Sequence, residues 1–298
     1  MSDYFRQHYI TSSYTKDSWV VRDAVAQRIK QKVEAVGVPL KNWDVQINYG
    51  IKTGYNEAFI IPKEKRDEIV GKCPEADGII RPILRGRDIQ KYYADWQGKY
   101  LIVSHTGYKD VNGHIIEPVN IDYYPAVREH LDQYWSEINK RQDKGITPYH
   151  LRSCIYMEDF FRPKIVWKRI GSVLRFSYDE TGLYCLDSTC FATGSNMKYL
   201  VGYLNSTMSK YDLLNNAPKT GTGDVITSVQ ALEPLLIPKA TKEQKEEIAV
   251  LVDNCIEIKK EHLSANISHF EHEIDEIFFQ IYNLTDEEID FIRNSQKH

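Results

Sequence analysis

The sequence predicts an α/β fold of the α+β type: a twisted, mostly antiparallel sheet followed by a C-terminal helical segment. Apolar residues recur three and four positions apart near the N-terminus and through the last 60 residues, which is the spacing of amphipathic helices. The middle of the chain has short apolar runs separated by glycine-containing turns, which are typical of strands. With 298 residues, of which 42% are hydrophobic and 27% charged, the chain can bury a substantial core.

Composition also predicts where the protein works. No run approaches the roughly 18–20 apolar residues of a membrane span, and the N-terminal residues lack the pattern of a secretory signal. The five cysteines are scattered without a Cys-x-x-Cys pair, which argues against a disulfide framework and a thiolate zinc site. We therefore expect a cytoplasmic protein that contacts no membrane.

The first predicted element is a helix over Asp17–Val36. Val21, Val25, Ile29 and Val33 lie four residues apart, and Gly37-Val-Pro39 supplies a stop signal.

A glycine-bracketed stretch, Asn48–Ile61, follows this helix. Gly50 and Gly54 allow positive φ and close backbone approach, so Ile51–Tyr55 can form a tight loop between two strands. Lys52 and Thr53 would present a cation and a hydroxyl at its tip, for which a phosphate is a natural partner. Because the lysine precedes the second glycine, the stretch is not a nucleotide P-loop. An ordinary hairpin tip is the alternative.

The remaining elements of the central region are read from the same two periodicities. In chain order we expect a short polar helix at Lys63–Lys72, a turn within Gly78–Ile89, a strand at Lys99–Ser104, a helix at Tyr124–Arg141 with Pro125 in its first turn, strands at Arg162–Ile170, Val173–Tyr178 and Tyr184–Phe191, a helix at Met197–Leu214, a loop at Asn215–Asp224 and a strand at Leu232–Pro238.

The C-terminal region is helical. Thr241 and Gln244 form a capping box, and Thr285 with Glu288 forms a second. The apolar stripe shifts at the five-residue step from Ile258 to Leu263, so the helix breaks there or changes partner. We divide the chain into an N-terminal helical connector (1–45), a central domain (46–238) and a C-terminal helical docking or dimerisation segment (239–298).

Charge is unevenly distributed. The chain has 38 Lys and Arg residues against 42 Asp and Glu, a net charge of −4. The segment from Lys239 onward has 7 basic and 14 acidic residues, so the preceding chain is slightly basic. Arg162–Tyr178 holds five basic residues and no acid. A locally basic face is therefore available, although scattered solvated charge would give the same composition.

Four segments, in this order, resemble the TaqI-like C-terminal specificity domain of type IIG restriction–modification enzymes and adenine methyltransferases. They are Gly50–Phe59, Arg81–Ile89 with Tyr92, Phe161–Trp167, and Leu204-Asn-Ser206 with Leu232–Pro238; the ending Ile274–Glu288 is also similar. The resemblance covers nearly the whole chain.

The resemblance implies sequence-specific recognition of double-stranded DNA, with a DNA methyltransferase domain or subunit as partner. The chain lacks the Asn-Pro-Pro-Tyr-type motif and glycine-rich cofactor loop of the family's methyltransferases. We therefore expect no catalytic residue, cofactor or metal on this chain; S-adenosylmethionine and Mg²⁺ would serve the absent catalytic domains. A homodimer through the C-terminal helices is a further expected assembly.

Several residue types here suit DNA contacts. Arginine can bind phosphate or guanine O6 and N7 in bidentate fashion, and asparagine can read adenine. An Arg87–Asp88 ion pair that braces the turn is the alternative for that segment. The expected DNA-contacting residues are Lys52, Thr53, Asn56, Arg81, Arg85, Arg87, Lys164, Lys168, Arg169, Arg175, Lys219 and Thr220.

Strand periodicity limits this set. Alternation puts Lys164, Val166 and Lys168 on one face of a strand and Ile165, Trp167 and Arg169 on the other. These cations cannot all share one surface, so we expect some of them to snorkel to the surface or to pair with acids.

The residues leave three other interpretations open. Glu158, Asp159 and Lys164 could form a Mg²⁺-dependent nuclease site, although Pro163 interrupts the usual spacing. The C-terminal helices could make the chain a protein-interaction module. His269 and His272 have helical ligand spacing, but no third ligand is indicated.

Overall fold

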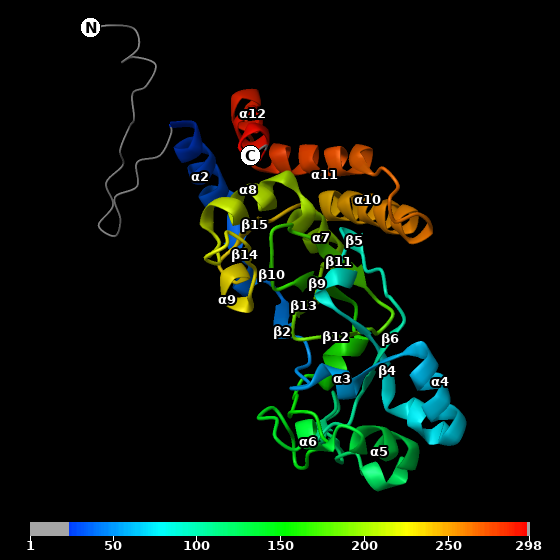
Figure 1. Cartoon of the computed structure of the whole chain (residues 1–298). Coiled ribbons are helices and arrows are strands. Elements are labelled where there is room, and N and C mark those ends of the chain that lie inside the picture. The colour runs from blue at the N-terminus through cyan, green and yellow to red at the C-terminus, as the bar shows by residue number, and fades with distance from the viewer. Residues whose placement is uncertain (1–23, 297–298) are drawn as a thin grey trace, which may run out of the picture.

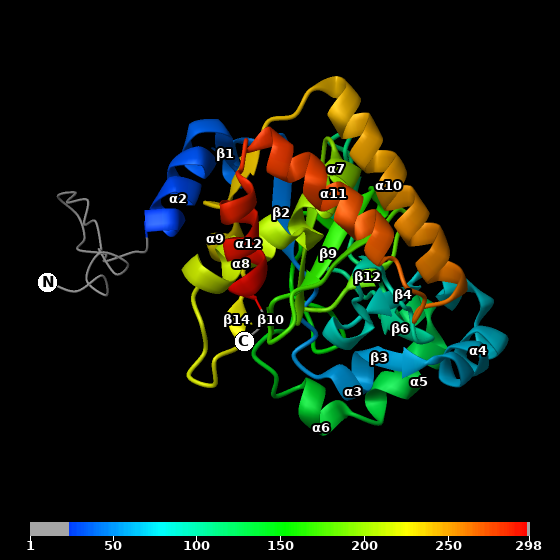
Figure 2. The same cartoon turned by 90° about the horizontal axis from the view of Figure 1, so that it is seen from above.

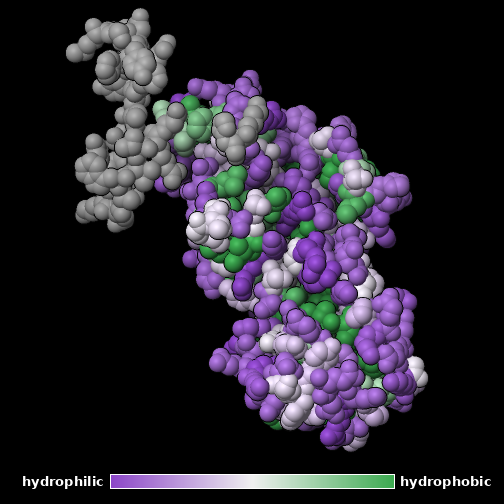
Figure 3. Space-filling model, viewed as in Figure 1, coloured by the Kyte–Doolittle hydropathy of each residue, from purple (hydrophilic) through white to green (hydrophobic). Residues whose placement is uncertain are grey.

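The computed structural model describes residues 24–296. Strands occupy the middle of the molecule, with helices α2, α7, α8 and α10–α12 on one side and α3–α6 on the other (Figure 1). Hydrophilic residues cover most of both parts, and an apolar patch lies between them (Figure 3). Within 24–296, no helix is long and apolar enough to cross a membrane.

A five-stranded sheet is the centre of the fold. Its order is β2 (Val45–Tyr49), β13 (Thr189–Gly194), β9 (Lys164–Lys168), β11 (Phe176–Asp179), β5 (Tyr92–Tyr93), and all neighbours are antiparallel except β11 and β5. The sheet is covered on both faces. Ile165 and Trp167 of β9 join one hydrophobic core and Val166 joins the other, which confirms the predicted alternation.

The first core lies under helices. They are α2 (Ala24–Val36), α7 (Met197–Asn205), α8 (Thr207–Asn216), α10 (Lys242–Glu261), α11 (Ser268–Ile281) and α12 (Asp286–Asn294). β1 (Gly37–Pro39) pairs with β15 (Leu236–Pro238) at its margin. Because α2 and the C-terminal helices share this core with the sheet, the outer segments are packed onto the central domain; the division at residues 45 and 238 stays a prediction.

The second core belongs to a four-stranded sheet in the order β12 (Tyr184–Cys185), β4 (Ile80–Leu84), β6 (Lys99–Ile102), β3 (Ile60–Pro62). The helices α3 (Asn56–Phe59), α4 (Lys63–Lys72), α5 (Pro125–Asp132) and α6 (Trp135–Ile138) accompany it. The smaller elements are β7 (Tyr108–Lys109), β8 (Ile115–Ile116), β10 (Ile170–Gly171), β14 (Val225–Ile226) and α9 (Val229–Leu232).

Local helix signals are confirmed. Pro125 occupies the first turn of α5. Both capping boxes form, at Thr241 before α10 and at Thr285 before α12. The stripe shift marks a break: α10 ends at Glu261, α11 begins at Ser268, and the two helices lie side by side (Figure 2). Residues 17–23 of the predicted first helix lie outside the described part.

Several predicted elements are wrong in extent or partner. The Ile51–Tyr55 loop is not a hairpin tip, because β2 and β3 belong to different sheets and α3 lies between them. The predicted strand Tyr184–Phe191 is two strands in different sheets. The predicted helix Met197–Leu214 divides at Ser206, which caps α8, and Tyr124–Arg141 divides between α5 and α6.

Candidate nucleic-acid interface

One edge of the five-stranded sheet brings together segments that are far apart in sequence. The strand register places Tyr49, Cys190, Trp167 and Phe176 side by side across β2, β13, β9 and β11. The chain positions just beyond this row therefore meet at the same edge. They lead to Lys52, the turn 186–189, Lys168 and Arg169, and Arg175.

A turn at residues 186–189 ties this edge to its neighbours. Leu186 N donates to Leu84 O at 2.9 Å, and Asp187 N donates to Ile51 O at 3.0 Å. Ser188 O accepts from Arg169 N at 3.0 Å, and its Oγ accepts from Gly86 N at 3.2 Å. Four segments therefore hold one another in fixed positions.

Gly50 is required by this arrangement. A Cβ at residue 50 would lie 2.1 Å from the carbonyl oxygen of Leu186, so only glycine permits the approach. Gly54 has φ +73°, a left-handed conformation that glycine adopts without strain. Both glycine roles predicted from the sequence, close approach and positive φ, are found, each at one position.

The surface that this edge presents is basic. We define the basic edge as Lys52, Arg87, Arg152, Lys168, Arg169 and Arg175. Arg87 joins it because Gly86 packs near Lys168: a Cβ on Gly86 would lie 3.1 Å from Lys168 Cγ. Lys168, Arg87 and Arg175 are exposed. Arg175 lies at the far end, where its guanidinium donates to Gln90 Oε1 at 2.7 Å.

A cavity of about 470 Å³ opens at the basic edge. Its lining includes Tyr49, Lys52, Arg152, Tyr156, Arg169 and Asp187. Tyr156 OH donates to the carbonyl of Tyr49 at 3.1 Å, which fixes one wall. The lining combines cations, one carboxylate and two aromatic rings, a set suited to the charged and flat surfaces of a nucleic acid.

Arg169 has a hydrogen-bonded backbone and one aromatic contact to its side chain. Its backbone N–H donates to Ser188 O, and its carbonyl accepts from Thr227 N at 2.9 Å. Its guanidinium carbon lies 5.9 Å from the centre of the Tyr49 ring, a cation–π contact. The backbone of this residue is therefore fixed, and Tyr49 is the aromatic partner of its guanidinium.

Lys52 and Arg152 share one acid. Asp143 Oδ2 lies 2.8 Å from Lys52 Nζ, and Asp143 Oδ1 lies 3.4 Å from Arg152. The hydrogen bond from Lys52 lowers the pKa of Asp143 below its ordinary value. The Lys52 side chain is still 52% exposed, so its ammonium can reach a further anion.

Arg141 organises this region and was missed in the sequence. It is buried, and it donates to the backbone carbonyls of Thr53, Asp143 and His150 while lying 4.4 Å from the centre of the Phe59 ring. Burial lowers its pKa to about 10. Nothing in Lys140-Arg-Gln-Asp-Lys144 distinguishes this arginine from its exposed neighbours. Arg152 and Asp187 were also missed.

Three of the predicted DNA-contacting residues are corrected, because their side chains are buried or engaged with other residues of the chain. Lys164 is completely buried, ion-paired with Asp179 and hydrogen-bonded to Phe160 O. Thr53 is 2% exposed and donates to Asn56 Oδ1 at 2.6 Å.

Arg85 is the third correction. Its side chain is 15% exposed and makes a two-pronged contact with Asp88, at 3.0 and 2.8 Å. The predicted Arg87–Asp88 brace is therefore wrong in its partner: Asp88 pairs with Arg85, and Arg87 is the exposed arginine of the turn.

The other predicted positions lie around the edge. Arg81 is half-buried on β4, and Asn56 is exposed at the start of α3. Lys219 and Thr220 lie at the tip of a short hairpin that ends in β14, whose partner β10 begins one residue after Arg169. Thr220 N donates to Asp224 O at 2.9 Å, so this segment is a closed turn rather than an extended arm.

The nuclease grouping does not assemble. Asp159 accepts from Asn48 Nδ2 at 2.9 Å, and Lys164 is engaged with Asp179 in the interior. His269 and His272 each pair with a glutamate on α11. Between residues 24 and 296, no three His, Cys, Asp or Glu side chains are grouped to hold a metal ion.

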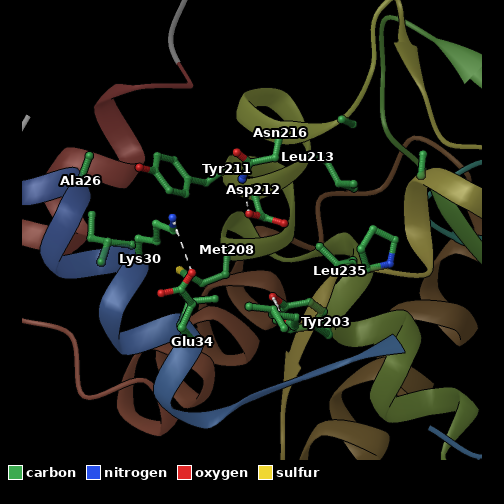
Figure 4. A pocket seen from close by; sticks show the side chains of 16 residues that line it. Ala26, Lys30, Glu34, Tyr203, Met208, Tyr211, Asp212, Leu213, Asn216 and Leu235 are labelled. Atoms are coloured by element: carbon green, nitrogen blue, oxygen red, sulfur yellow. Dashed lines mark hydrogen bonds and ion pairs between the residues drawn. The ribbon is translucent and has the colours of Figure 1, made fainter. Parts of the chain in front are cut away.

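A second cavity, of about 270 Å³, lies between α2 and α8 (Figure 4). Apolar side chains such as Ile29, Val33 and Met208 line it, and the Lys30–Glu34 ion pair sits at its side. It belongs to the helical side of the molecule and adds no cation to the basic edge.

Comparisons with known proteins identify the family. The family model of the TaqI-like C-terminal specificity domain matches residues 81–235, about half of the chain. No curated protein sequence matches significantly. Among solved structures, the chain is similar to the type IIL restriction–modification enzyme MmeI in complex with DNA (TM-score 0.65, 12% identity, covering 87% of this chain and 36% of that one).

It is also similar to the type IIG restriction endonuclease BpuSI (TM-score 0.51, 14% identity, covering 87% of this chain and 32% of that one). The chain thus spans about a third of each enzyme. At these identities the two likenesses establish the fold, and the family rests on the matched model. The chain belongs to the family of TaqI-like C-terminal specificity domains.

Proposed function

We propose that the basic edge binds double-stranded DNA and that the chain selects the sequence on which a restriction–modification enzyme acts. The main support for this proposal is that basic residues distant in sequence lie together at the basic edge. Its six cations come from five separate segments, and three of them, Lys52, Arg152 and Arg169, line one cavity, although the chain has a net charge of −4. Affinity for duplex DNA comes mainly from such phosphate contacts.

The members of the basic edge suit different tasks. Lys168 and Arg87 are exposed, as is Arg152, with a side chain 67% exposed; these three suit phosphate contacts, which position the duplex. Arg169 lies at the cavity wall with a fixed backbone and an aromatic contact to its guanidinium, which suits base readout, because a residue that discriminates bases must keep its geometry. A bidentate arginine contact selects guanine.

The proposed partners follow from the family and from the fact that the chain spans only about a third of each similar enzyme. We propose that methylation or cleavage belongs to other domains, with S-adenosylmethionine and Mg²⁺ acting there, and that this chain contributes recognition without catalysis in the cytoplasm. The exposed faces of α10–α12 are the proposed docking surface for a methyltransferase domain; a homodimer through the same helices is the competing assembly.

The proposal is tested by titrating fluorescent duplex DNA with the wild-type chain and with Arg169→Ala. If Arg169 contacts a base, its loss weakens binding by about 1–3 kcal/mol. Lys242→Ala is the matched control, because Lys242 is 83% exposed on α10, outside the basic edge. Equal affinity of the wild type and Arg169→Ala, or equal losses in both variants, would count against the proposed interface.

A further inference from the structure

Asp187 is an acid inside a basic cavity. It lines the wall with Lys52 and Arg169. A carboxylate facing a phosphate backbone is repelled, so this residue opposes DNA binding unless it meets a donor. We propose that Asp187 accepts a hydrogen bond from the N4 amino group of a cytosine, which makes a C·G base pair part of the recognised sequence. This inference rests on the proposed function.

Asp187 does not stabilise the fold through an ion pair as other buried or half-buried aspartates here do. Its carboxylate accepts from Ser188 N, and among residues 24–296 it has no ion pair within 4.0 Å, in contrast to Asp88, Asp143 and Asp179. A carboxylate offers about four acceptor sites, so most of its capacity is unused.

Its surroundings leave it poorly solvated. Asp187 is half-buried, and desolvation raises its pKa although Arg169 and Lys52 oppose that change. A partly desolvated carboxylate gains more from a new donor than an exposed one does, because less water must be displaced. The position is also rigid, since Asp187 N donates to Ile51 O within the turn that joins four segments.

The chemistry of the major groove selects cytosine. Cytosine presents its N4 amino donor there with an acceptor, guanine O6, on one side only, whereas the N6 donor of adenine is flanked by acceptors on both sides, its own N7 and thymine O4, which would repel the second carboxylate oxygen. The guanine paired with this cytosine presents O6 and N7, both acceptors. Arg169, on the same cavity wall, carries the donors that fit them.

Selection from a random double-stranded DNA library, followed by sequencing, tests the inference. The wild type, Asp187→Ala, Asp187→Asn and the control Asp290→Ala, an exposed acid on α12, are compared after circular dichroism shows each to be folded. The wild type is expected to select a motif with a C·G pair whose replacement weakens binding about tenfold or more.

Asp187→Ala should weaken the preference at that position alone, because the cytosine contact is lost while Arg169 still favours the paired guanine. Asp187→Asn should weaken it as well, because asparagine reads adenine rather than cytosine. Asp290→Ala should keep the wild-type motif. A folded Asp187→Ala that keeps every preference at wild-type strength, or that loses affinity equally for all sequences, would overturn the assignment while leaving the proposed function intact. A wild type that binds no duplex would overturn both.

Discussion

Three basic residues in and directly after β9, within positions 164–169, have different environments. Lys164 is buried in an ion pair, Lys168 is exposed, and Arg169 lies against an aromatic ring at the cavity wall. The two lysines lie at opposite ends of β9: Lys164 begins the strand and is buried beside Asp179 of β11, whereas Lys168 ends the strand and is exposed, with Arg169 directly after it. Charge type alone does not separate a structural lysine from a binding one.

This difference gives a prediction for Lys164→Met. The substitution leaves Asp179 charged and buried without its cation, which should lower the free energy of unfolding by about 3–5 kcal/mol. Urea denaturation measures the change, with Lys168→Met as the matched control, expected within about 0.5 kcal/mol of the wild type. If Lys164→Met lowers the free energy of unfolding by less than about 0.5 kcal/mol, the structural role assigned to the Lys164–Asp179 ion pair is contradicted.

The C-terminal helices complete the core as well as offering a docking surface. Ile248 and Val252 of α10 and Ile274 and Phe278 of α11 are completely buried against the sheet side of the molecule. Burying a side chain of this size contributes about 1.5–3 kcal/mol. These helices therefore cannot be removed without exposing the sheet.

Deletion of residues 239–298 should consequently unfold the remaining chain rather than leave a DNA-binding remnant. Circular dichroism and thermal melting should show no cooperative transition for the truncated chain. A truncated chain that melts cooperatively near the wild-type temperature would show that the helices are an independent unit.

At the scale of single elements, the sequence predicted best those features that depend on residues close together in the chain. The capping boxes at Thr241 and Thr285 depend on residues three positions apart, and both form. Strand partners depend on segments far apart in sequence, so the assignment of β2 and β3 to separate sheets and the splitting of Tyr184–Phe191 could not be predicted. The site follows the same rule: Lys52 and Arg169 were expected, whereas Arg141 and Asp187 matter only because other segments surround them.

At the scale of the whole molecule, the residues that stabilise the fold and those proposed to bind DNA occupy different parts of the five-stranded sheet. Its two faces are covered by the two cores, and one of its edges carries the cations. The acidic excess lies mostly in the C-terminal segment, which has 14 acidic and 7 basic residues. A chain with net charge −4 can therefore present a positive surface to DNA, because the field near a surface depends on local charge.

The salt dependence of duplex binding tests this central claim most directly. Each phosphate contact releases counterions, so log K should fall linearly with log salt concentration. Replacing Lys168 or Arg152 by alanine should reduce the steepness by about one each, whereas Lys242→Ala should leave it unchanged. An affinity that does not respond to salt, or a slope that neither replacement alters, would contradict the basic edge as the DNA-binding surface.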